Sequence, residues 1–159
     1  MRKMPGQTLA SMGLAALLLA VPVACAKKPN PEVVGTWRCH ELQPTPYEIM
    51  DFDLTVEPAG RFMVNADANG QLETGEFVFN FTGSGKLTTP KDQFIAIYKE
   101  ITFHSASLDG VPYSDEDLAK FAQQTLDAVG YTFTIDRLTA DELAMHDKTS
   151  HTVCARTEG

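Results

Sequence analysis

Basic residues are scarce in this chain. Its 159 residues include 13 Lys and Arg against 21 Asp and Glu, which gives a formal net charge of −8 at pH 7. A domain with this charge repels nucleic acid and anionic lipid headgroups, so both are excluded as partners. A basic protein partner is compatible with the charge, although a solvated acidic surface is the more common reason for such a balance.

Long hydrophobic runs are absent beyond the N-terminus. The mostly apolar residues 9–23 follow Arg2 and Lys3 and lead into the small residues 24–26. This arrangement is typical of an export signal. The run is short for a membrane-spanning helix, and no positive stop-transfer cluster beyond two lysines follows it. We therefore predict that residues 1–26 serve targeting and that the protein is exported to the periplasm or cell envelope.

Two cleavage positions remain open in this signal. One lies after Ala26. The other resembles a bacterial lipoprotein signal, because Cys25 follows small residues, although Pro22 stands where such signals usually carry Leu. This resemblance implies a signal of residues 1–24 and an acylated Cys25, which would be the only attachment to a membrane. In either case residues 27–34, with their lysines and prolines, are predicted to form a semi-rigid linker.

Cysteine is also scarce. Only Cys39 and Cys154 accompany Cys25, and their spacing matches no Cys-x-x-Cys metal or redox motif. Two lone cysteines in an exported domain most simply form one disulfide, which we expect to place the first element beside the last. Closing so long a loop contributes roughly 4 kcal/mol in the chain-entropy model. A catalytic thiol is the alternative, but no activating residues surround either cysteine.

Alternating apolar and polar residues dominate the chain from Gly35 onward. This pattern predicts short strands, with turns over residues 58–60, 67–70 and 82–85. One helix is predicted over residues 114–129, with Ser114 as its N-cap and Gly130 as its stop.

Eight or nine short antiparallel strands and one inserted helix indicate an all-β fold. The hairpin-by-hairpin order and the first-to-last disulfide favour a small antiparallel up-and-down barrel over residues 35–156. Closure into a barrel also removes the exposed edges of an open sheet. A β-sandwich is the alternative architecture.

The opening strand also resembles a known family. Gly35-Thr36-Trp37 is similar to the Gly-x-Trp signature of lipocalins and related calycins, and residues 57–62 are similar to the first-hairpin turn of bacterial lipocalin-like domains. The resemblance covers residues 33–156. It implies a lipocalin-like barrel with Trp37 packed across its base. Lipocalins place their main helix after the barrel strands, whereas the predicted helix here precedes the last strands.

Sequence motifs for catalysis and metal binding are absent or incomplete. His146, Asp147 and His151 surround one predicted hairpin, but their spacing matches no established ligand pattern, and polar turn residues explain them more simply. A pairing of His40 with His151 is conceivable through the predicted disulfide. No serine has an evident base or oxyanion partner. We therefore predict no catalytic residues, no metal, no cofactor and no enzymatic activity.

Aromatic residues are plentiful, with nine phenylalanines in so small a domain. In a tight barrel they would fill the interior completely, which is the favoured interpretation of these residues. If some face an open mouth, they would line an apolar pocket instead. The candidates for such a pocket are Phe52, Phe62, Phe77, Phe79 and Phe133.

These features predict an envelope protein that binds a small hydrophobic ligand without catalysis. Residues 108–113 and the helix are expected to cover one end of the barrel. The alternative is a protein-facing module, an inhibitor or assembly factor, that uses the acidic helix start at residues 115–117 against a basic partner. A hollow interior distinguishes the first hypothesis from the second.

Overall fold

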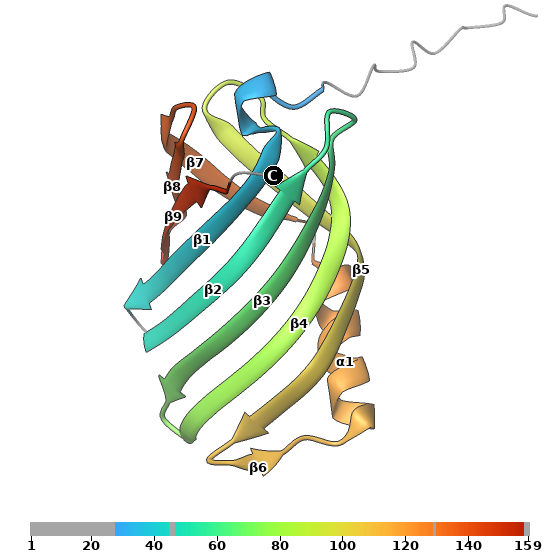
Figure 1. Ribbon diagram of the computed structural model, residues 1–159. Helices are drawn as coiled ribbons and strands as arrows, with labels where there is room; N and C mark the ends of the chain where they lie inside the picture. The colour runs from blue at the N-terminus through green and yellow to red at the C-terminus, as the bar shows by residue number, and fades with distance from the viewer. Residues whose placement is uncertain (1–27, 45–46, 129, 158–159) are drawn as a thin grey trace, which may run out of the picture.

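The structure is a computed structural model that describes residues 28–44, 47–128 and 130–157 (Figure 1). The predicted export signal, in either its 1–24 or its 1–26 form, lies outside the described residues, as does the lipidation candidate Cys25. Within the described chain, no helix has both the length and the apolar character needed to cross a membrane.

Strands make up most of the described chain, with one short 3-10 helix and one α-helix. The elements in chain order are η1 (Pro31–Val33), β1 (Gly35–Pro44), β2 (Tyr47–Val56), β3 (Arg61–Leu72), β4 (Gly75–Thr88), β5 (Gln93–Leu108), β6 (Val111–Pro112), α1 (Asp115–Asp127), β7 (Tyr131–Leu138), β8 (Glu142–His146) and β9 (His151–Arg156).

The strands form one antiparallel sheet that curls into a near-closed ring. Its order is β4-β3-β2-β1-β9-β8-β7-β5-β6, and β4 also pairs with β5. Strands β1–β6 and β7–β9 therefore pair with their neighbours in sequence. After α1 the chain returns to pair β7 with β5 instead of β6, and β9 pairs with β1 (Figure 1). The prediction of an all-β, antiparallel up-and-down barrel with one inserted helix is confirmed.

The ring is weakest between β5 and β7. These strands pair only between Gln93–Ala96 and Tyr131–Thr134, although β5 continues to Leu108. Helix α1 packs against β5 beyond this point, and Phe121 makes an edge contact with Phe103 of β5, with ring centroids 6.2 Å apart. The helix thus covers the flank that the strands leave open, rather than an end of the barrel.

Two predicted turns are wrong. Residues 67–70 lie inside β3, and residues 82–85 lie inside β4, so these strands are 12 and 14 residues long. Gly83 and Gly85 of β4 are explained by close approach: a Cβ at Gly85 would collide with the Ile97 carbonyl oxygen, and one at Gly83 would lie 2.6 Å from the Tyr98 ring. The glycines allow the strand to bend at a register shift instead of reversing the chain.

The helix begins as predicted. The Ser114 hydroxyl accepts a hydrogen bond from the Asp117 backbone N–H at 3.2 Å, as an N-cap does. The helix ends at Asp127, earlier than expected, and Val129 lies outside the described residues. Gly130 then begins the approach to β7 with a φ of +133°.

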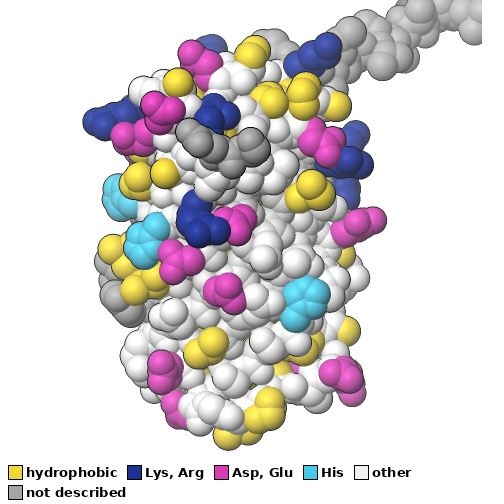
Figure 2. Space-filling model, viewed as in Figure 1, with side chains coloured by type: hydrophobic (Ala, Val, Ile, Leu, Met, Phe, Trp, Pro, Cys, Tyr) yellow, Lys and Arg dark blue, Asp and Glu magenta, His cyan; other side chains and the backbone are white. Residues whose placement is uncertain are grey.

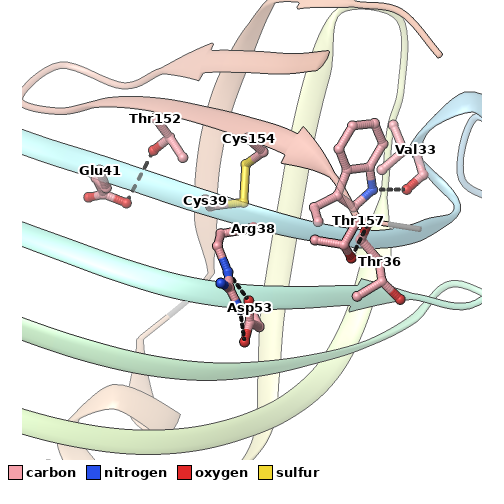
Figure 3. The surroundings of a disulfide bond; sticks show 10 residues. Val33, Thr36, Arg38, Cys39, Glu41, Asp53, Thr152, Cys154 and Thr157 are labelled. Carbon is pink, nitrogen blue, oxygen red and sulfur yellow. Dashed lines mark hydrogen bonds and ion pairs between the residues drawn. A yellow bond between two sulfur atoms is a disulfide. The ribbon is translucent and has the colours of Figure 1, made fainter. Parts of the chain in front are cut away.

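The predicted disulfide is present. Cys39 and Cys154 are directly opposite each other in the β1–β9 register, with an S–S distance of 2.04 Å (Figure 3). It joins the first and last strands, which are the two strands that close the ring. Both cysteines are buried.

One end of the barrel has a packed floor built around Trp37. The Trp37 side chain is fully buried, and its indole N–H donates to the Val33 carbonyl at 2.8 Å (Figure 3). The Arg156 guanidinium stacks on the indole, 4.0 Å from the ring centroid. It also donates to the carbonyl oxygens of Val34, at 2.8 Å, and Glu32, at 2.6 Å. A cation stacked on an aromatic face and bonded to the backbone holds the entering chain against the last strand.

The region predicted as a linker contributes to this floor. Pro29 and Val33 are buried, and residues 31–33 form η1. The Asn30 backbone N–H donates to the Thr89 hydroxyl at 2.5 Å. The described residues 28–34 therefore contact the barrel, through the Val33 carbonyl that accepts from Trp37 and the Asn30 N–H that donates to Thr89.

Replacing Arg156 should destabilise the protein far more than replacing an exposed arginine. We expect Arg156→Ala to lower the free energy of unfolding by about 2–3 kcal/mol, since it removes a cation–π contact and charge-assisted hydrogen bonds. The matched control is Arg38→Ala. The Arg38 side chain is 72% exposed and forms an ion pair with Asp53 at 3.0 Å. This control should cost less than about 1 kcal/mol. Urea denaturation measures both, and equal losses would contradict the role assigned to Arg156.

Candidate functional site

The barrel interior contains a cavity of about 410 Å³. It lies above the Trp37 floor and is enclosed by β1–β5, β7, β8 and α1. The lining residues are Glu41, Gln43, Glu48, Met50, Phe52, Leu54, Phe62, Val64, Phe79, Phe81, Phe94, Ala96, Tyr98, Ile101, Phe103, Thr125, Tyr131, Phe133, Met145, Asp147 and Thr149. The interior is therefore hollow, and the filled-barrel interpretation of the phenylalanines is wrong.

Small residues on β3 help to keep this space open. Ala66, Ala68 and Gly70 are all buried on the inward face of that strand, where alternation would also admit large side chains. They are opposite the phenylalanines of β4: Ala66 pairs with Phe81, and Ala68 pairs with Phe79. Each large ring thus extends over a small neighbour instead of meeting a second large side chain.

Aromatic rings form much of the cavity wall. Phe79 and Phe103 meet edge to face with centroids 5.8 Å apart, and Phe62 meets Tyr98 in the same way at 5.1 Å. Tyr98 also makes an edge contact with Tyr131 at 5.7 Å. Such contacts fix the rings relative to one another, so the wall is largely preformed.

Four of the five pocket candidates line the cavity. Phe52, Phe62, Phe79 and Phe133 all belong to its wall, on β2, β3, β4 and β7. Phe77 does not line the cavity. Its ring stacks on Phe79 with centroids 5.6 Å apart, nearer the hairpin that joins β3 to β4.

Acidic and polar residues occupy one end of the cavity. On β1, strand alternation places Glu41 and Gln43 on the same inward face as Trp37, farther from the floor. On β2, Glu48 is opposite Gln43 in the register. Asp147 and Thr149, in the turn between β8 and β9, complete this end. The cavity therefore has an apolar body and an acidic end.

Glu41 is the most deeply buried of these acids, with 6% of its surface exposed. One carboxylate oxygen accepts a hydrogen bond from Gln43 at 3.3 Å, and the other accepts one from Thr152 at 3.2 Å (Figure 3). Burial raises the pKa of Glu41, although these neutral donors partly offset the effect. The charge is thus held in a partly dehydrated site by neutral groups.

The neighbouring titratable groups are affected by the same environment. Burial raises the pKa of Glu48, and the negative charge of Glu41 adds to this effect. Burial raises the pKa of the Tyr98 phenol above its usual range, and the nearby Tyr131 and Glu41 add to the rise. Tyr98 is therefore a neutral hydroxyl in the cavity wall at physiological pH.

Asp147 behaves differently because it anchors its own turn. Burial tends to raise its pKa, but hydrogen bonds from the backbone N–H groups of Thr149 and Ser150, both at 2.7 Å, outweigh burial and lower it. Asp147 is therefore a satisfied carboxylate. The side-chain carboxylate of Glu48, by contrast, forms no hydrogen bond or ion pair with another side chain within the described residues.

The histidines take other partners. His146 contacts Asp136 at 2.7 Å and faces His151 across the β8–β9 pair, with ring centroids 5.8 Å apart. His40 contacts Asp51 at 2.8 Å, not His151. Among residues 28–44, 47–128 and 130–157, no group of three or more potential ligands could hold a metal ion.

Sequence reasoning did not select the polar residues of the cavity. Glu41 carried a usable signal, because it is in phase with Trp37 and Cys39 along one strand and so belongs to the buried face. No comparable signal marked Tyr98 or Tyr131, which come together only when β5 and β7 pair near Ala96.

Neutralising Glu41 should stabilise the protein at neutral pH. Because its pKa in the folded protein lies above the ordinary value of 4.5, ionisation costs stability as the pH rises through the folded-state pKa. We expect Glu41→Gln to raise the free energy of unfolding by roughly 1 kcal/mol at pH 7.5. The gain should vanish at a pH below the ordinary pKa of Glu, where the side chain at position 41 is neutral in the unmodified protein as well as in the variant. Urea unfolding at pH 7.5 and 3.5 measures this, and an equal effect at both values would contradict it.

Comparison with known proteins finds only structural similarity. No family model and no curated protein matches the chain. The fold is similar to the crystal structure of a lipocalin-like protein from Bacteroides uniformis, with a TM-score of 0.44 and 14% identity over 79% of this chain and 99% of that one. It is also similar to an uncharacterized protein from Bacteroides eggerthii, with a TM-score of 0.46 and 14% identity over 78% and 98% of the respective chains.

Proposed function

We propose that this protein binds a small hydrophobic ligand in the barrel cavity, without catalysis. The observation that carries the proposal is a cavity of about 410 Å³ whose walls are mainly aromatic and aliphatic. Its volume falls within the range of roughly 300–1,000 Å³ that is typical of small-molecule sites.

Desolvation supplies the binding free energy in this proposal. Each methylene group that leaves water for an apolar wall contributes about 0.8 kcal/mol. The edge contacts among Phe62, Tyr98 and Tyr131 hold the wall in place before the ligand arrives, so little conformational entropy is lost on binding. A preformed apolar site therefore favours compact, partly apolar molecules.

The proposal places the protein in the periplasm or cell envelope, either free or anchored through a lipid on Cys25. It rests there on the predicted export signal and on the Cys39–Cys154 disulfide, which is the kind of bond that persists in oxidising compartments. A binding protein in this location would carry or sequester a molecule of low solubility in water.

A protein-facing role is the weaker hypothesis. The acidic helix start was its proposed contact, but Lys120 lies 2.8 Å from Glu116 and 3.6 Å from Asp117 on the same helix. Asp117 also accepts a hydrogen bond from the Ser114 hydroxyl at 2.7 Å. Lys120 thus offsets one of the three negative charges in the first turn of the helix, which leaves less charge for a basic protein.

Filling the cavity should weaken binding of an apolar probe. N-phenyl-1-naphthylamine is a neutral dye that fluoresces in apolar sites. We expect it to bind the protein, and Met50→Trp to weaken its affinity about tenfold, or about 1.4 kcal/mol, because the indole occupies the space of the ligand. Fluorescence titration measures both affinities.

The matched control is Met63→Trp, at an outward position of β3 that is 44% exposed. It introduces the same side chain outside the cavity and should leave dye affinity unchanged. Circular dichroism of both variants checks that the barrel is intact. Absence of dye binding to the unmodified protein, or equal losses in the two variants, would contradict the proposed function.

A further inference from the structure

We propose that the ligand is an amphiphilic amine, with its apolar part among the aromatic walls and its ammonium group between Glu41 and Glu48. This inference rests on the proposed function and adds the chemistry of the ligand's polar group. It starts from the composition of the cavity: its lining includes three carboxylates and no Lys, Arg or His.

The two carboxylates are close together in the fold. Glu41 and Gln43 are successive inward residues of β1, and Glu48 pairs with Gln43 from the adjacent strand β2. All three residues line the same cavity. A cation at this end could therefore meet both carboxylates at once, while the body of the ligand extends toward Phe52 on the same sheet.

Neither carboxylate has a cationic partner within the described residues. The Glu41 carboxylate accepts hydrogen bonds from the neutral side chains of Gln43 and Thr152, and the neutral Ser150 also stabilises its charge. Glu48 forms none, although it is half-buried. The described ion pairs all lie elsewhere on the barrel and helix.

Two like charges in a partly dehydrated site are costly without a counterion. A buried carboxylate that served only to bond Gln43 and Thr152 could be replaced by a neutral amide without that cost. An ammonium group offsets both charges and donates up to three hydrogen bonds, which are stronger when they join ionised groups. A fatty acid, by contrast, would place a third negative charge beside Glu41 and Glu48.

On the face shown in Figure 2, the outer surface is acidic toward the same end of the barrel as the acidic end of the cavity. There the Lys and Arg side chains gather in the upper half, toward the Trp37 floor, whereas the lower half shows acidic side chains and no basic ones. Glu41 lies toward the end of β1 and Glu48 near the start of β2, and these strand ends are the ones farther from that floor (Figure 1). A negative field at this end attracts cations and repels anions.

Displacement of N-phenyl-1-naphthylamine by three ligands that share one chain tests the inference. The ligands are decylamine, decan-1-ol and decanoate at pH 7.5, where an alkylammonium remains charged because its pKa, like that of Lys, is about 10. We expect decylamine to displace the dye at a concentration about tenfold lower than decan-1-ol, and decanoate to be the weakest.

Two double variants assign this preference to the carboxylates. Glu41→Gln with Glu48→Gln should reduce the preference for the amine over the alcohol to less than about threefold. Glu73→Gln with Glu76→Gln removes the same charge from exposed positions and should leave the preference unchanged. The preference is the ratio of amine to alcohol within each protein, so a change in dye affinity does not affect it. Circular dichroism of all three proteins checks that the barrel is intact.

The outcomes separate the two proposals. If the dye binds but the amine is no better than the alcohol, or if decanoate is best, the amine inference is overturned and the proposed function stands. An amine preference that survives in the Glu41 and Glu48 double variant also overturns it, since the carboxylates would not be its cause. If neither the dye nor any of the three ligands binds, both proposals are wrong.

Discussion

The pairing of β1 with β9 is the contact on which the rest of this barrel depends. These strands come from opposite ends of the described chain, and their union converts an open meander into a ring. The Cys39–Cys154 bond makes the pairing covalent, and Arg156 on Trp37 secures the same two strands one layer nearer the floor. Without this seam the sheet would expose two edges, and the interior would not be enclosed.

The packing density of the barrel interior falls along the barrel axis, from the Trp37 floor toward the other end. Near the floor, Trp37, Leu143 and Val33 are fully buried and leave little free space. Farther along, Ala66, Ala68 and Gly70 are opposite bulky side chains of the adjacent strand β4, and a cavity remains. A dense layer at one end supplies stability, so the other end can stay hollow while the fold remains intact.

Stability and binding oppose each other at Glu41. Holding this carboxylate in the cavity wall costs free energy in the unliganded protein, because the neutral donors Gln43 and Thr152 do not fully replace water. The same incomplete compensation would favour a ligand that brings positive charge. Sites that bind or react commonly retain such locally costly groups, since the cost is recovered when the partner arrives.

Local sequence patterns determined a large part of this structure. Period-two alternation identified most strands and their inward faces, Ser114 marked the start of the helix, and the two lone cysteines predicted the joining of the first and last strands. Each of these features depends on neighbouring residues or on a simple pairing rule, so each can be read without the fold. The glycines were an exception, because the sequence pattern predicted a turn at Gly83 and Gly85. These glycines instead allow the close approach of β5, which is known only from the position of that strand in the fold.

The cavity was decided by the tertiary structure alone. Alternation tells which side of a strand faces inward, but the enclosed volume depends on how many strands close the ring, how they tilt, and which side chains meet across it. For this reason four phenylalanine candidates could be placed on the wall while Phe77 could not be separated from them. The acidic end likewise required β1, β2 and the β8–β9 turn to converge, because no single stretch of sequence contains Glu41, Glu48 and Asp147 together.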